Sequence, residues 1–109
     1  MNGNIMKWVI LALGVIFEVL GTISMKYAEG FTKLVPSLLV FVFYGISLAS
    51  LVLVLKKMEV SIAYGIWASA GTALIAIIGM IWFNENVSII KVVSIFFIII
   101  GILGLELFD

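Results

Sequence analysis

The chain has 109 residues, of which 65% are hydrophobic and only 11% are charged. A water-soluble domain of this size could not bury so much apolar surface, so soluble globules and disordered tails are excluded. Six basic residues balance six acidic ones, and cysteine and histidine are absent, which argues against nucleic acid as a partner, disulfides, zinc sites, cofactors and enzymatic catalysis.

The chain contains four apolar segments that are long enough to cross a membrane, since a spanning helix needs roughly 20 such residues. These spans cover about residues 5–27, 34–55, 60–84 and 87–106. The connections between them are short, so consecutive helices run antiparallel, and an even number of spans places both termini on one side. The sequence predicts an all-α membrane protein whose residues 1–109 form a single four-helix transmembrane domain.

The ends of the predicted spans carry residues that usually begin or end helices. Gly30 can end the first helix in a left-handed conformation, and Pro36 suits the first turn of the second. Ser61 is expected to be the N-cap of the third helix, and either Asn86 or Ser88 that of the fourth.

The first span contains one internal charge, Glu18. At 1.5 Å per residue, Glu18 lies about 16 Å from Lys7 and about 12 Å from Lys26 along the helix. An ionised side chain at that depth costs at least about 2.5–3.5 kcal/mol, and no other span carries a charge at a similar depth. Glu18 could be a protonated structural acid, but an intramembrane carboxyl typically indicates an ion or proton site. We therefore expect a proton and a cationic substrate to bind Glu18 in competition.

Small and polar residues share the helix face of Glu18. Gly14 and Gly21 allow a helix or a ligand to come close, and Thr22 supplies a hydroxyl group. Simple helix packing by the two glycines remains an equal alternative.

The second and third spans each carry a polar or aromatic pair separated by three residues. The second span offers Tyr44 and Ser47. The Tyr44 hydroxyl could orient Glu18 or sense its protonation, or it could form only an interhelical hydrogen bond. Tyr64 and Trp67 begin one turn into the third span and continue toward its middle, which argues against an interfacial role for Trp67. Aromatic faces attract desolvated organic cations.

The fourth span has almost no polar chemistry, which favours dimerisation over transport. Ser94 and Gly101 are seven residues apart and share a face with Ile98 and Leu105, a spacing that lets two helices cross closely.

Loop lysines, which normally set membrane orientation, are balanced between the two sides of the predicted bundle. One side has Lys7, Lys56 and Lys57, and the other has Lys26, Lys33 and Lys91. Either another signal orients the chain, or it inserts both ways and forms an antiparallel, dual-topology dimer. Such a dimer would resemble an inverted-repeat transporter with a site near the midplane.

Several motifs resemble those of one family, the small multidrug resistance transporters. The first-helix signature is matched by Glu18-Val19-Leu20-Gly21-Thr22, Met25-Lys26 and Glu29-Gly30-Phe31-Thr32. Later motifs follow in order at Pro36-Ser37, Tyr44, Ser47, Ala63-Tyr64-Gly65-Ile66-Trp67 and Gly101. The resemblance covers essentially the whole chain.

The resemblance implies a multi-pass protein of the bacterial inner membrane that exchanges protons for lipophilic organic cations as an antiparallel homodimer. It implies that both copies of Glu18 form the shared proton and substrate site. The implied chamber is lined by Trp67, Tyr64, Tyr44, Ser47, Thr22, Gly14 and Gly21. The fourth helix matches the dimerising helix, although Ser94 stands where glycine is common. Residues 68–71 also contain less glycine than the family often has at the kink of its third helix.

The position of Gly21 separates two branches of the family. Exporters of guanidinium typically carry tryptophan there, whereas glycine leaves space for bulky cations, so the resemblance favours multidrug efflux of quaternary ammonium compounds. A guanidinium exporter is the alternative. A non-transporting membrane assembly module is a less favoured alternative, because a scaffold needs neither Glu18 nor the aromatic residues.

Overall fold

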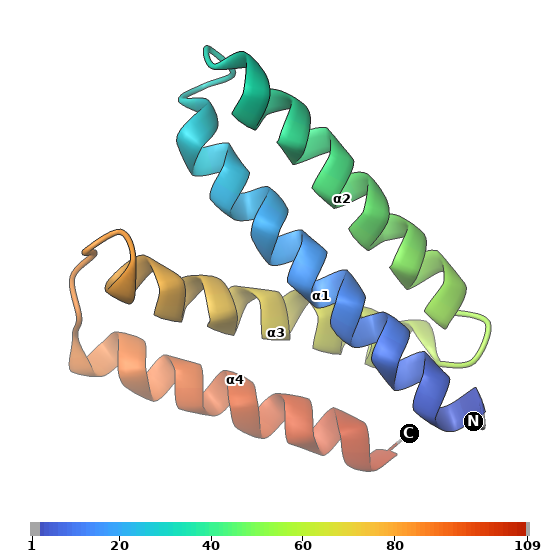
Figure 1. Ribbon diagram of the computed structural model, residues 1–109. Helices are drawn as coiled ribbons and strands as arrows, with labels where there is room; N and C mark the ends of the chain where they lie inside the picture. The colour runs from blue at the N-terminus through green and yellow to red at the C-terminus, as the bar shows by residue number, and fades with distance from the viewer. Residues whose placement is uncertain (1–2, 109) are drawn as a thin grey trace.

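A computed structural model describes residues 3–108 (Figure 1). It contains four helices, α1 (Gly3–Ala28), α2 (Leu34–Val54), α3 (Val60–Ile81) and α4 (Ile89–Phe108), and no strand within these residues. Each helix is long and apolar enough to cross a membrane. The prediction of an all-helical, multi-pass membrane protein is therefore confirmed, and the helix ends lie within three residues of the predicted spans.

The helices form two antiparallel hairpins, α1 with α2 and α3 with α4 (Figure 1). The hairpins converge near both termini and the α2–α3 connection. They spread apart toward the α1–α2 and α3–α4 connections at the opposite end. Both termini therefore lie on the same side, as the even number of spans predicts.

The end of α1 confirms the predicted role of Gly30, which has a φ of 69°. Its neighbours Glu29 and Phe31 also adopt positive φ angles, 48° and 68°, a conformation that side chains disfavour. The backbone N–H of Thr32 donates to the carbonyl oxygen of Ala28 at 3.0 Å. This bond satisfies a helix-end acceptor and reverses the chain.

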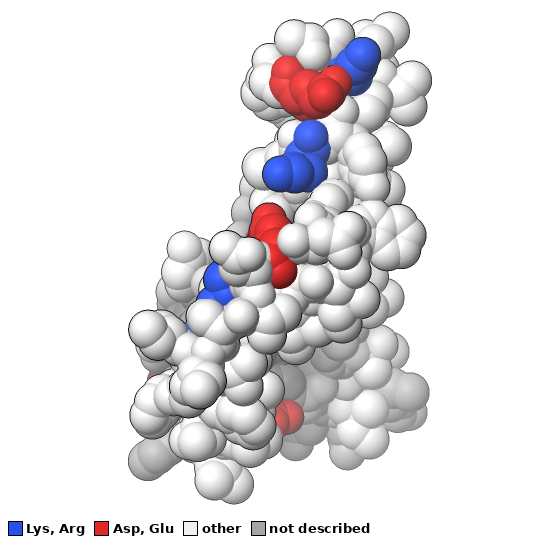
Figure 2. Space-filling model, turned by 90° about the vertical axis from the view of Figure 1, so that its left-hand side faces the viewer, with Lys and Arg blue, Asp and Glu red and all other residues white. Residues whose placement is uncertain are grey.

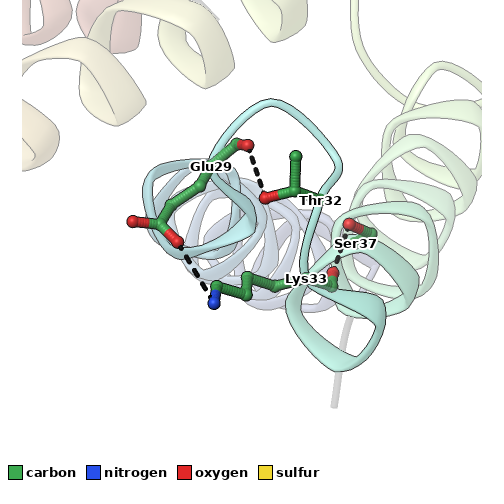
Figure 3. A network of polar contacts seen from close by, with 4 residues as sticks. All are labelled: Glu29, Thr32, Lys33 and Ser37. Atoms are coloured by element: carbon green, nitrogen blue, oxygen red, sulfur yellow. Dashed lines mark hydrogen bonds and ion pairs between the residues drawn. The ribbon is translucent and has the colours of Figure 1, made fainter.

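Polar side chains hold the α1–α2 connection in place (Figure 3). The Lys33 ammonium lies 3.7 Å from the Glu29 carboxylate. The hydroxyl groups of Thr32 and Ser37 donate to the carbonyl oxygens of Glu29 and Lys33, at 2.9 and 2.5 Å. The charge of Glu29 is thus locally balanced.

The other helix ends are partly as predicted. Pro36 lies in the first turn of α2, and the Ser88 hydroxyl caps α4 by accepting from the N–H of Lys91 at 3.2 Å. The prediction for Ser61 was wrong, because α3 begins at Val60 after an extended Glu59 that makes no side-chain cap.

The third helix ends earlier than predicted, at Ile81 rather than at residue 84. Asn84 adopts a left-handed φ of 54°, and the N–H of Glu85 folds back to the carbonyl oxygen of Gly79 at 3.0 Å. The α3–α4 connection therefore lies against the last turn of α3.

The buried core lies at the end where the hairpins converge, which we call the closed end. Its buried core consists of Leu11, Val54, Met58, Ile62, Ala63 and Ile66. The sequence places Lys7 at the edge of the first span, but the structure buries it to 8% exposure, with its ammonium 5.9 Å from the Trp8 ring centroid.

The opposite end, which we call the open end, holds a cavity of about 320 Å³ between the last two turns of α1 and of α3. Its lining consists of Thr22, Ile23, Met25, Lys26, Ile75, Gly79, Phe83 and Glu85. Figure 2 shows this end of the molecule, where basic and acidic side chains follow one another along a surface that is otherwise uncharged.

Candidate functional site

Glu18 lies at the middle of α1, between the closed end and the open end. Its carboxyl group packs against Gly71 of α3, where a methyl group in place of the glycine hydrogen would lie 2.9 Å from the Glu18 carboxyl carbon. Glu18 Oε2 is buried, and no residue that the structure describes donates a hydrogen bond to it. Gly71 therefore creates the space that the carboxyl group occupies.

The hydroxyl groups of Tyr44 in α2 and Thr22 in α1 connect α2 to this carboxyl group. Tyr44 Oη lies 2.5 Å from Thr22 Oγ1, and the Thr22 hydroxyl lies 3.0 Å from the carbonyl oxygen of Glu18 and 3.5 Å from its Oε1. Thr22 thus connects Tyr44 to Glu18, and the hydrogen bond of Thr22 to the carboxyl group is long.

Gly21 accommodates the ring of Tyr44. A methyl group at position 21 would lie 2.6 Å from Tyr44 Cδ2, so the glycine is required for this contact between α1 and α2. The space above Gly21 is thus filled by a side chain of the same protein. This differs from the expectation that Gly21 leaves open space for a bulky cation.

Ser47 connects three helices in the tightest part of the site. Its side chain is 0% exposed, and its hydroxyl donates to the carbonyl oxygen of Gly14 at 2.7 Å. The indole Nε1–H of Trp67 donates to Ser47 Oγ at 2.8 Å. Ser47 thereby fixes the Trp67 ring beside Gly14, one helical turn from Glu18.

The two aromatic residues of α3 differ in exposure. Their rings are tilted at 42° with centroids 5.6 Å apart. Trp67 is half-buried, whereas Tyr64 is 55% exposed and lies at the outer edge of the site. The structure thus gathers Gly14, Glu18, Gly21, Thr22, Tyr44, Ser47 and Trp67 at one junction of α1, α2 and α3.

The predicted dimerisation residues lie on α4, the least buried helix of the bundle. Ser94 and Gly101 are exposed, and a methyl group at position 101 would meet no atom within 4 Å. Ile98 is half-buried. Leu105 is also half-buried, and it packs against Gly65 of α3.

Gly71 is the site residue that the predicted set lacks. It follows Trp67 by four residues and therefore shares its helix face, which was the available signal. Periodicity places a glycine on a face but does not identify the group that will occupy the space above it, so its contact with Glu18 emerges only from the packing of α1 on α3.

Comparisons with known proteins agree on one family. A family profile described as Small Multidrug Resistance protein matches residues 6–98. The chain is 51% identical to the uncharacterized membrane protein YvaE of Bacillus subtilis, over 95% of this chain and 87% of that protein. It is 39% identical to the quaternary ammonium compound-resistance protein QacG of a Staphylococcus species, over 94% and 96%. It is 33% identical to a guanidinium exporter of Yersinia pseudotuberculosis, over 94% and 98%.

Proposed function

Because the chain belongs to the small multidrug resistance family of membrane transporters, we propose that it is a proton-coupled antiporter that exports hydrophobic and quaternary ammonium cations. It is a multi-pass protein of the bacterial inner membrane. In this proposal Glu18 binds either a proton or the substrate.

The observation that carries the proposal is the buried, unpartnered Glu18 Oε2. An ionised carboxylate in hydrocarbon without a counter-charge is unfavourable by several kcal/mol, and no lysine in residues 3–108 forms an ion pair with it. The group is therefore stable in two forms, either protonated or bound to a cation. Because one form excludes the other, arrival of protons on one side of the membrane releases the substrate.

We propose that the working unit is an antiparallel homodimer with two Glu18 residues in a shared chamber. One copy supplies only one carboxyl group and the half-buried face of Trp67. The balanced loop lysines allow both insertions, and the exposed Ser94–Gly101 face of α4 can pack against a second copy. Exchange between two asymmetric arrangements would then alternate access to the midplane.

The aromatic residues favour hydrophobic cations over small ones. The Trp67 and Tyr64 rings can contact a desolvated organic cation through their faces. The similar protein QacG is named for resistance to quaternary ammonium compounds. Guanidinium is the second candidate, because a carboxylate with open acceptor positions suits its planar N–H groups and guanidinium exporters are also similar to the chain.

Transport into proteoliposomes distinguishes these proposals. We expect uptake of tetraphenylphosphonium driven by an outward proton gradient, and loss of that uptake in Glu18→Gln, whereas Glu59→Gln in the α2–α3 connection retains it. Substrate affinity should fall as the pH falls, because protons compete for Glu18. Proton-driven uptake that persists in Glu18→Gln contradicts the mechanism, and transport of guanidinium alone selects the second candidate.

Orientation can be tested because the chain has no cysteine. A single cysteine in place of Lys57, in an exposed connection, should react with an impermeant maleimide from both sides of the membrane in comparable amounts. Labelling from one side only would contradict the antiparallel dimer.

A further inference from the structure

The mouth of the open-end cavity brings together a cation, an aromatic ring and an acid. Lys26 Nζ lies 5.7 Å from the centroid of the Phe83 ring, within the distance at which a cation is attracted to an aromatic face. Glu85 lines the same cavity. In the part of the chain that the structure describes, Lys26 and Glu85 form no ion pair.

The backbone of the α3–α4 connection sets this arrangement. Asn84 turns the chain with its positive φ, and the Glu85 N–H bonds to Gly79. Because Gly79 has no side chain, the Glu85 carboxylate lies against α3, where a methyl group on residue 79 would be 3.0 Å from its carboxyl carbon. Glu85 is therefore held at the cavity by a fold-back of the chain.

Aromatic residues fix the other side of the mouth. Trp82 Nε1–H donates to Tyr27 Oη at 2.8 Å, and this bond links the end of α3 to the end of α1. The Tyr27 and Phe83 rings lie 5.8 Å apart. The Phe83 ring is thus positioned beside Lys26 by contacts between the two hairpins.

In the described part of the chain, the other acid at this end, Glu29, is already paired with a lysine, whereas Glu85 is not. The Glu29 carboxylate is turned toward Lys33 (Figure 3), so its charge is already balanced. Glu85 is exposed and has no such partner among residues 3–108. The cavity that it lines reaches Thr22, whose hydroxyl group contacts Glu18. A cation at Phe83 and Glu85 would therefore lie on the route to Glu18.

We propose that Phe83 and Glu85 form a second binding subsite for monovalent organic cations, and that Lys26 occupies it when no substrate is present. This inference rests on the proposed function, since its ligand is the exported cation. A substrate cation displaces the Lys26 ammonium from the Phe83 face and is held there by Glu85 before it passes to Glu18. The tethered lysine acts as an internal competitor.

Two groups of variants test the subsite through opposite effects. The variants Phe83→Leu and Glu85→Gln should each bind the cation about two- to fivefold more weakly, which is the range of an exposed cation–aromatic or ion-pair contact. Lys26→Met preserves the chain length but removes the competitor, so binding should tighten by about the same factor. A gain in affinity cannot arise from misfolding.

The experiment is titration calorimetry of tetraphenylphosphonium into the purified full-length protein in detergent micelles. Each variant is measured alone and together with Glu18→Gln, which isolates the second subsite. Phe96→Leu, Glu59→Gln and Lys57→Met are the matched controls, because these exposed residues lie away from the cavity. Gly79→Ala should imitate Glu85→Gln, since a methyl group there displaces the Glu85 carboxylate.

Residual binding to Glu18→Gln that Glu85→Gln weakens and Lys26→Met strengthens would support the subsite. The proposal is overturned if Glu18→Gln removes all binding, or if the mouth variants match their controls. Neither result affects proton-coupled export through Glu18. Conversely, proton-driven transport by Glu18→Gln would overturn the proposed function, whereas the mouth variants would still measure the subsite.

Discussion

The closed end and the open end of the bundle are built from different residues, and Glu18 lies between them. At the closed end, Leu11, Val54 and Ile62 are buried among aliphatic neighbours. At the open end, Lys26 and Phe83 border a cavity of about 320 Å³. The difference arises along the same pair of helices, α1 and α3, over only a few turns.

The contact between α1 and α3 advances in steps of four residues, which is close to one helical turn. Gly14 faces Trp67 and Glu18 faces Gly71, and both pairs are in contact. One turn further, Thr22 and Ile75 instead line the cavity. The two helices therefore separate one turn beyond Glu18, and the cavity lies on only one side of its carboxyl group. This is the asymmetry that one state of an alternating-access transporter needs.

The largest effect is expected where the two ends meet. Gly71→Ala places a methyl group in the space of the Glu18 carboxyl group. Since a flexible side chain can move aside, the protein should fold, and alanine even favours the helix by about 1 kcal/mol. The carboxyl group will be displaced, however, and a misplacement of about 1 Å can cost about a hundredfold in rate. Proton-driven uptake of tetraphenylphosphonium measures this loss.

A matched control for this substitution is Gly45→Ala. Gly45 lies within α2, and a methyl group there meets no atom within 4 Å. Transport that falls equally in both variants would show that helix flexibility, and not the Glu18 contact, explains the effect.

The second effect concerns the packing of Leu11 in the closed-end core, which we expect to block proton passage. Leu11 is 2% exposed, and truncation of a buried leucine to alanine costs about 2 kcal/mol or more because a void remains. We expect Leu11→Ala to lower the free energy of unfolding in mixed micelles by this amount and to leak protons in vesicles. Leu13→Ala, on the exposed face of the same helix, should do neither. A Leu11→Ala variant that is as stable as the unchanged protein and leaks no protons would show that this packing does not block proton passage.

A third test measures access at the two ends directly. Single cysteines replace Ile75, which lines the cavity, or Ile62, which is 5% exposed in the closed-end core. A water-soluble maleimide should modify position 75 at least about tenfold faster, because reaction at a buried position requires local opening. Equal rates at the two positions would remove the distinction between a closed and an open end.

Much of the fold could be predicted from the sequence, since length and hydropathy determine the four spans. The early end of α3 could not, because it depends on the left-handed Asn84 and on the bond from Glu85 to Gly79. The burial of Lys7 could not be predicted from the sequence either. A charged residue near a span end is normally read as interfacial, and only the packing of neighbouring helices moves it inside.

The candidate site shows the same division. Glu18 was predictable because an intramembrane charge is costly and therefore conspicuous. The glycines were predictable only as positions of close approach. Gly21 receives the Tyr44 ring and Gly71 the Glu18 carboxyl group, and the choice of occupant depends on how three helices come together. The role of α4 in dimerisation remains a prediction.

The smallest expected effect lies in the hydrogen bonds on the closed side of Glu18. Ser47→Ala removes the acceptor of the Trp67 indole N–H and a donor to the Gly14 carbonyl oxygen. Loss of such buried bonds should cost about 1 kcal/mol of unfolding free energy, and the freed Trp67 ring should bind aromatic cations a few times more weakly. Ser50→Ala is the control, because Ser50 bonds only to Ile46 of its own helix. If Ser47→Ala weakens aromatic and tetraalkylammonium cations equally, Ser47 supports the bundle in general, and the Trp67 ring is not the group it positions for substrate.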